Sequence, residues 1–164
     1  TKTSKTNLKA VQGELLNFKQ ALMPLEDVAL TDSNWRAMQV MALMGVFKLE
    51  ISQGKLNFYP EHPATFNDVE DALNAFYYKA NIWFEDHENA KVDLDQALSL
   101  ICYVGNKSVP QVKREVEKKW KAAYKFKESL TAGQVLTRRQ FAVLLHDQLQ
   151  LFDIGTDAAG RIIK

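Results

Sequence analysis

The sequence predicts an all-α fold of about six helices, arranged as a pseudo-repeat of helix-loop-helix units. Apolar residues recur at steps of three and four along most of the 164 residues, which is the spacing of one helical face. Residues that cap helix N-termini precede several of these stretches. No stretch alternates apolar and polar residues as a half-buried strand does, so we expect at most a short β segment around Leu56–Phe58.

The composition is that of one globular domain. Hydrophobic residues make up 46% and charged residues 25%, which excludes a disordered chain. The single Cys102 can form no internal disulfide, and we interpret it as a packing residue. The formal net charge of +1 provides no global field to attract nucleic acid, and no apolar stretch reaches the roughly 20 residues that span a bilayer. We therefore expect no nucleic-acid partner and no membrane span.

We interpret 1–164 as a single domain in three parts. These are an N-terminal helix in 1–24, helical repeats in 25–152, and a loosely packed tail in 153–164 with two glycines. The first helix is expected from about Thr6 to Ala21, and its apolar face comprises Leu8, Val11, Leu15, Phe18 and Leu22. Because the chain begins with Thr rather than Met, we expect a processed or excised piece, in which any signal peptide would already be missing.

Two helices separated by a proline-containing loop are predicted next. The apolar face of the first comprises Trp35, Met38, Met41, Ala42 and Val46. Gly45 stops or bends this helix, and Pro60 excludes helix from the loop. Thr65, with Asp68 three residues later, is a capping pair that begins the second helix. We expect Trp35 to be buried where the first helix meets its neighbours.

The middle of the chain predicts a short helix after an acidic loop. We interpret Glu85–Glu88 as exposed and irregular. Asp93 is an N-cap residue with Gln96 three positions on, so a helix is expected over Leu94–Val104. Gly105-Asn106 then provides a suitable end, because both residue types tolerate the left-handed backbone conformation.

A long helix with a basic surface follows Pro110, which is tolerated in a first turn. Its apolar face comprises Val109, Val112, Val116, Trp120 and Ala123. Its basic residues are Lys113, Arg114, Lys118, Lys119, Lys121, Lys125 and Lys127. We interpret them as a solvated face. The alternative is that 109–127 is an adaptor helix that contacts an acidic partner or a polyanion.

The three capped helices share one pattern of apolar positions. Their caps are Thr65, Asp93 and Thr137, and the last forms a capping pair with Gln140. The residues four, seven and eight positions after the caps are Val69, Ala72 and Leu73; Ala97, Leu100 and Ile101; and Phe141, Leu144 and Leu145. An aromatic or apolar loop residue precedes each cap, namely Phe58, Phe84 and Leu130. The agreement of cap, loop and register indicates a degenerate threefold repeat.

These motifs resemble the S-layer homology module. The matching residues are Trp35, Gly45, Phe58, Pro60, Thr65 and the run Thr137–Leu145, which is similar to that family's Thr-Arg-Ala-Glu-Phe signature. The match covers roughly 27–152. The run Leu8–Leu15 ahead of it resembles the C-terminal region of secreted bacterial FAD-dependent oxidoreductases, which are often labelled xanthan lyases.

We find no catalytic, cofactor-binding or metal-ligating motif. A dinucleotide site would need a glycine-rich turn between a strand and a helix, and none has that spacing. The histidines, His62, His87 and His146, form no paired motif for zinc, and the acidic loop lacks the alternating ligand spacing of a calcium loop. No serine lies in a nucleophile elbow. We expect no cofactor, no metal and no independent enzyme.

The resemblances imply a non-catalytic C-terminal accessory domain of a larger secreted, periplasmic or cell-envelope protein. Its expected partner is either its own N-terminal catalytic domain or an envelope glycan. In S-layer homology modules the arginine after the capping threonine lines a pocket for acidic glycan, and here only Arg138 matches it, since Phe66 and Leu94 occupy the equivalent places. We interpret Arg138 as a solvated residue of a first helical turn, with a glycan contact as the alternative, and we therefore expect little or no affinity for pyruvylated wall polysaccharide. The candidate ligand or partner contacts are Arg138, Arg139, Lys118 and Lys121.

Overall fold

The computed structural model describes residues 23–150, 155–156 and 162–163. These residues are predominantly helical, which confirms the all-α prediction. The predicted helix from Thr6 to Ala21 lies outside them, as does most of the tail in 153–164. Within the described part the strands form two short antiparallel pairs, β1 (Glu50–Ser52) with β2 (Lys55–Asn57) and β3 (Gly155–Thr156) with β4 (Ile162–Ile163).

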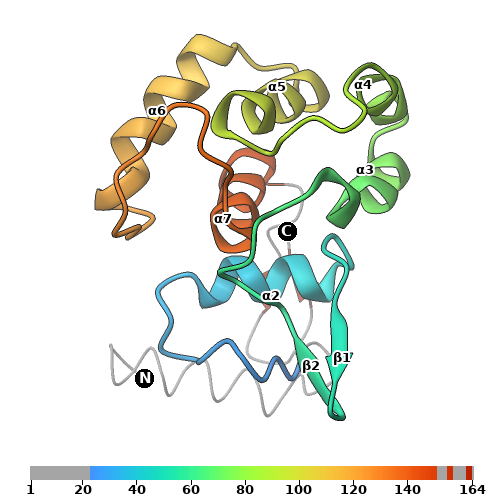
Figure 1. Cartoon of the computed structure of the whole chain (residues 1–164), viewed down its shortest axis with the longest axis vertical. Helices are drawn as coiled ribbons and strands as arrows, with labels where there is room; N and C mark the ends of the chain where they lie inside the picture. Colours follow the sequence, from blue (N-terminus) through green and yellow to red (C-terminus); the bar gives the residue numbers. More distant parts are fainter. Residues whose placement is uncertain (1–22, 151–154, 157–161, 164) are drawn as a thin grey trace.

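The helices of the described residues form three consecutive units of two helices each (Figure 1). The first unit comprises α2 (Trp35–Leu43) and the 3-10 turn η2 (Phe66–Asp68) with α3 (Glu70–Phe76); the second comprises α4 (Ala80–Asp86) and α5 (Leu94–Gly105); the third comprises α6 (Val109–Ala122) and α7 (Arg138–Leu149). Helix α7 packs against both α2 and α5, so the last helix lies between the first two units.

All three predicted N-caps are confirmed. The Thr65 hydroxyl accepts a hydrogen bond from Asp68 N (3.3 Å), and the Asp93 carboxylate accepts one from Gln96 N (2.9 Å). The Thr137 hydroxyl accepts one from Gln140 N (3.1 Å), and the Gln140 side chain accepts one from Thr137 N (2.9 Å). Each bond satisfies a first-turn N–H that has no partner within its helix, so each cap fixes where its helix begins.

The residues that precede the three caps meet at the centre of the fold. Ala64 N donates to Leu136 O, and Leu136 N donates to Val92 O, each at 2.8 Å. All three residues are buried. The repeat found in the sequence therefore has a spatial counterpart, in which three helix starts lead away from one shared main-chain junction.

An aromatic cluster joins the three units beside this junction. Phe141 of α7 contacts Phe47 of the first unit and Phe66 of η2, with ring centroids 5.9 Å apart in both pairs. Phe66 in turn lies 5.0 Å from Trp83 of α4. These edge-on contacts are the geometry that aromatic pairs prefer. The rings therefore hold all three units in one core.

Two sequence-based expectations for the helices are wrong. Trp35 is only partly buried, because it is the first residue of α2 and lies at the end of the helix rather than beneath it. Glu85 and Asp86 belong to the short helix α4 rather than to a loop, because Trp83 and Phe84 pack into the core and hold that turn helical.

Three residues differ from their expected burial. Val109 is 39% exposed and Ala123 is also exposed, although we expected both on the apolar face of the basic helix. In the third unit the fully packed loop aromatic is Phe126, whereas Leu130 is only partly buried.

Phe141→Ala should destabilise the protein by about 3–5 kcal/mol, because it removes a fully buried ring of the third unit that contacts two rings of the first unit. Urea denaturation followed by circular dichroism measures this. Ile51→Ala, at a side chain that is 76% exposed, is the control and should change stability by less than about 0.5 kcal/mol. Equal losses for the two variants would contradict the assignment of Phe141 to the core.

Candidate functional site: the junctions between helical units

Arg138 is a buried link between the third unit and the first. Only 6% of the residue is exposed. Its Nε donates to Phe58 O and its Nη2 to Lys48 O, both at 2.7 Å, and its Nη1 lies 2.6 Å from Asp68 Oδ1. The guanidinium also lies 5.2 Å from the ring centres of Phe47 and Phe58.

The expectation of a solvated Arg138 is therefore wrong. The position immediately after the N-cap faces the core in all three units, since Phe66 and Leu94 are each 8% exposed and Arg138 is 6% exposed. In the third unit this inward place holds a cation, which contacts two main-chain carbonyls and one carboxylate. The apolar residues at the two equivalent positions were the sequence feature that could have indicated this burial.

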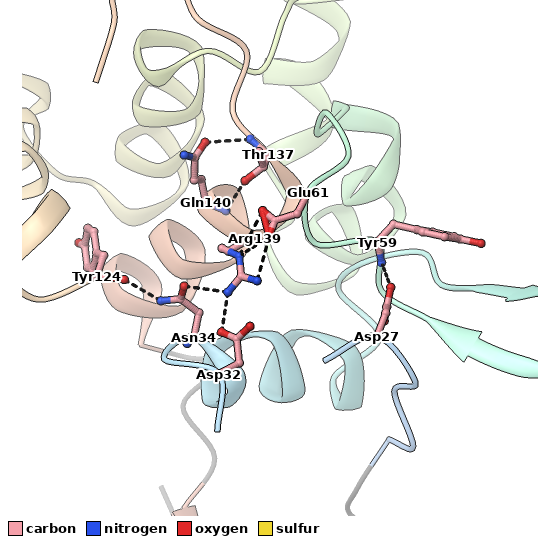
Figure 2. Close-up of polar contacts among 9 residues, drawn as sticks. All are labelled: Asp27, Asp32, Asn34, Tyr59, Glu61, Tyr124, Thr137, Arg139 and Gln140. Atoms are coloured by element: carbon pink, nitrogen blue, oxygen red, sulfur yellow. Dashed lines mark hydrogen bonds and ion pairs between the residues drawn. The ribbon is translucent and has the colours of Figure 1, made fainter. Parts of the chain in front are cut away.

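Arg139 fills the outer part of the same junction (Figure 2). Its Nη1 lies 2.5 Å from Asp32 Oδ1 and 3.1 Å from Asn34 Oδ1, and its Nη2 lies 2.9 Å from Glu61 Oε2. The side chain is 19% exposed and borders a cavity of about 330 Å³. Burial alone would raise the pKa of Asp32, but the hydrogen bonds from Arg139 and from Asn34 N, with the charge of Arg139, hold this pKa below its ordinary value of 3.8.

Asn34 connects this junction to a second polar cluster between α6 and α7. Its Nδ2 donates to Tyr124 O (2.8 Å), and the Tyr124 hydroxyl donates to Asp147 Oδ2 (2.5 Å). Lys119 Nζ lies 3.0 Å from the same carboxylate. Burial would raise the pKa of Asp147, but the bonds from Tyr124 and Lys119 outweigh it and lower this pKa. Burial, followed by the nearby carboxylate, raises the pKa of Tyr124.

The two candidate lysines lie away from these arginines. Lys118 and Lys121 are exposed on α6, and Lys121 Nζ donates to Ser129 Oγ at 3.3 Å. Lys118 borders a cavity different from the one beside Arg139. On the same helix, Lys113 is paired with Asp95. The structure thus brings Arg138 and Arg139 together at one junction and leaves the lysines on a separate surface.

The junction between the first and second units is the open counterpart of the Arg139 junction. Asn67 follows the Thr65 cap by two residues, as Arg139 follows Thr137. Asn89 precedes the Asp93 cap by four residues, as Glu61 precedes Thr65. In the Arg139 junction, Arg138 N and Arg139 N donate to His62 O and Pro60 O, both at 2.9 Å, and the long side chain fills the space.

A cavity of about 630 Å³ occupies this open junction. It is lined by Thr65, Phe66, Asn67, Glu70, Phe84, His87, Glu88, Asn89 and Ala90. The His87 ring stacks on Trp83 with centroids 3.9 Å apart and planes within 5°, and His87 Nδ1 lies 2.8 Å from Trp83 O. Neither Asn67 nor Asn89 takes part in a sequence motif, so no role could be predicted for them from the sequence.

Two further observations concern the described residues only. Within 23–150 and the two short tail strands, no group of three or more His, Cys, Asp or Glu side chains could hold a metal ion. Across the same residues, no helix combines the length and the apolar character that crossing a membrane requires.

Arg138→Met should cost about 3–5 kcal/mol, because it leaves the Asp68 carboxylate and two main-chain carbonyls without their buried partner. Urea denaturation measures the free energy of unfolding. Lys118→Met makes the same change at an exposed position and should be nearly neutral. A loss below about 1 kcal/mol for Arg138→Met would contradict the structural role of this arginine.

The stability should also fall in acid. Because the folded-state pKa values of Asp32 and Asp147 are lowered, their contribution is fully present above the unfolded pKa of about 4 and is lost as the pH falls through the folded values. Asp32→Asn should be less stable than wild type at pH 7 and should show a smaller loss between about pH 4 and pH 2. Thermal unfolding at a series of pH values tests this, with Asp71→Asn, at a side chain that is 82% exposed, as the matched control. Equal pH dependence in Asp32→Asn and wild type would contradict the prediction.

No protein-family model, no curated protein and no solved structure matches this chain.

Proposed function

We propose that this chain is a non-catalytic accessory domain of a larger secreted bacterial protein, in line with its resemblance to the C-terminal region of FAD-dependent oxidoreductases labelled xanthan lyases. Its role is to bind a glycan in the cavity between the first and second units. The observation that carries the proposal is that this junction holds a cavity of about 630 Å³, whereas at the equivalent junction the Arg139 side chain and its ion pairs leave a cavity of about 330 Å³.

The chemistry of the open junction suits a saccharide. Phe66 and Phe84 supply an apolar base, and sugar rings present apolar C–H faces to such surfaces. Around it, the amides of Asn67 and Asn89 both donate and accept hydrogen bonds, and the carboxylate of Glu88 accepts them. Sugar hydroxyls require both kinds of partner, so a few groups of this type fix an orientation.

The charge of the junction favours a neutral glycan. Glu70 and Glu88 line the cavity, and among the described residues that line it there is no lysine or arginine. Arg138 is occupied by internal partners, so it does not offer its charge to an acidic ligand. We therefore expect little or no affinity for a pyruvylated wall polysaccharide, because its carboxylates would meet two carboxylates, and Lys48, whose Nζ donates to Asn67 Oδ1 at 3.4 Å, is already paired with Asp71.

Packing against the catalytic part of the parent protein is a second candidate role, and one observation favours it. Large apolar side chains are exposed along the second unit and its borders, with Tyr78 93%, Ile82 51%, Phe76 39% and Tyr103 38% exposed. Such side chains are enriched at interfaces between domains. This surface is separate from the residues of the open junction, so docking and glycan binding are compatible.

Binding of neutral envelope oligosaccharides, measured by a glycan array and then by titration calorimetry, tests the proposal. Asn67→Arg should abolish binding, because it places a long side chain where Arg139 fills the equivalent junction. Asn81→Arg makes the same change at an exposed position on α4 and should leave binding intact. Glu88→Ala should weaken it by about tenfold through the loss of a charged hydrogen bond.

Three results would contradict the glycan role. These are a wild type that retains no neutral oligosaccharide, a wild type that prefers acidic glycans, and an Asn67→Arg variant that binds as well as Asn81→Arg. Circular dichroism of each variant confirms that the helices are intact before binding is compared.

A further inference from the structure

A second cavity, outside the junctions, gathers positive charge at the turn from α5 to α6. It has a volume of about 680 Å³ and lies beside the end of α7. Its lining residues are Asn106, Lys107, Ser108, Gln111, Val112, Arg114, Glu115, Lys118 and Gln148. Three of these side chains are cationic, so this cavity differs in charge from the open junction, whose ionised groups are acidic.

Two of the three cations are available to a ligand. Arg114 and Lys118 are exposed, lie one helical turn apart on α6, and form no ion pair with any residue of the described chain. Their neighbours on the same helix behave differently, since Lys113 pairs with Asp95 (2.9 Å) and Lys119 with Asp147 (3.0 Å). Of the three basic residues of α6 that form no ion pair within the described chain, Arg114 and Lys118 thus lie at this cavity and Lys121 lies outside it.

The remaining charged groups are fixed by internal contacts. Lys107 Nζ donates to Gln148 O, so its ammonium is held beside the cavity by the end of α7. Glu115 is the carboxylate among the described lining residues, and it is already engaged. Gln148 Nε2 donates to it at 3.0 Å and Lys119 Nζ lies 3.3 Å away, and these bonds lower the pKa of Glu115. Glu115 thus shares the positive charge of Lys119 with Asp147.

The start of α6 adds to this positive field. Ser108 at the N-cap makes no side-chain capping bond, and the first turn carries no acidic residue, whereas α3 and α5 do carry one. The positive end of the helix dipole is thus not compensated by a side chain of its own turn. This effect is secondary to the cationic side chains, on which the inference depends.

We propose that this cavity binds a multiply charged oxyanion of the phosphate or sulfate class, a role separate from glycan binding at the open junction. Arg114 contacts the oxyanion through two parallel N–H groups, a geometry that the planar guanidinium provides. Lys118 and Lys107 contribute as point charges. The same oxyanion can arrive free or attached to a sugar.

Titration calorimetry of the full chain at pH 7 and constant ionic strength tests this inference. The probes are inorganic phosphate, inorganic pyrophosphate, glucose 6-phosphate and glucose. We expect pyrophosphate to bind more tightly than phosphate, because it carries more charge, and glucose not to bind at this site. Binding of glucose 6-phosphate more tightly than phosphate identifies a sugar-borne oxyanion, and weaker binding identifies a free one.

Variants of α6 locate the site. Arg114→Gln and Lys118→Gln should each weaken pyrophosphate binding by about tenfold, the usual effect of losing one charged hydrogen bond. Lys121→Gln removes the same charge from an exposed position of the same helix outside this cavity, and should change the affinity by less than about twofold.

Two results would overturn the inference. Either the wild type does not bind pyrophosphate, or Lys121→Gln weakens binding as much as Arg114→Gln, which would indicate only general surface charge. Asn67→Arg, which fills the open junction, should leave pyrophosphate binding unchanged, so the failure of one site can be distinguished from the failure of the other.

Discussion

The fold depends on a main-chain junction in which Leu136 bonds to two other units at once. Its N–H donates to Val92 O and its C=O accepts from Ala64 N. All three residues are buried, and buried main-chain groups must be paired, so the three segments can meet in few registers. Because a helix cap follows each of these residues immediately, this register also sets where η2, α5 and α7 begin. The aromatic cluster is then packed as a consequence of those positions.

The side chains around this junction make the three interfaces unequal. Two adjacent arginines close the interface between the third and first units, and they contact main-chain carbonyls, carboxylates and an amide. Burying a cation is unfavourable unless its donors are satisfied, so Arg138 and its acceptors depend on one another. At the corresponding interface of the first and second units, a short asparagine leaves a cavity. One repeated backbone arrangement thus supports a structural junction and a candidate binding junction.

The sequence predicted the features that are encoded locally. The caps at Thr65, Asp93 and Thr137 and the apolar register behind them depend on residues within one or two turns, and all are present. Helix α4 was missed because it is seven residues long and Lys79 gives it no side-chain cap. The open junction could not be predicted, because its two sides are brought together only by the packing of separate units. The burial of Arg138 was missed because arginine is usually exposed, although the equivalent positions of the other two units hold the apolar residues Phe66 and Leu94.

The place of α7 has a consequence for how the chain is completed during its synthesis. A nascent chain emerges from its N-terminal end, yet α2 packs against α7, and Asp32 and Asn34 find their partner in Arg139. Until α7 has left the ribosome, Phe47 and Phe58 lack the helix that covers them. The entropy cost of bringing such distant segments together is not yet offset by their contacts. The earlier units therefore emerge with apolar surface uncovered, the condition under which nascent chains aggregate or need a chaperone. Arg139 of α7 lies 107 residues after its partner Asp32, so α7 completes contacts whose first members are made long before it.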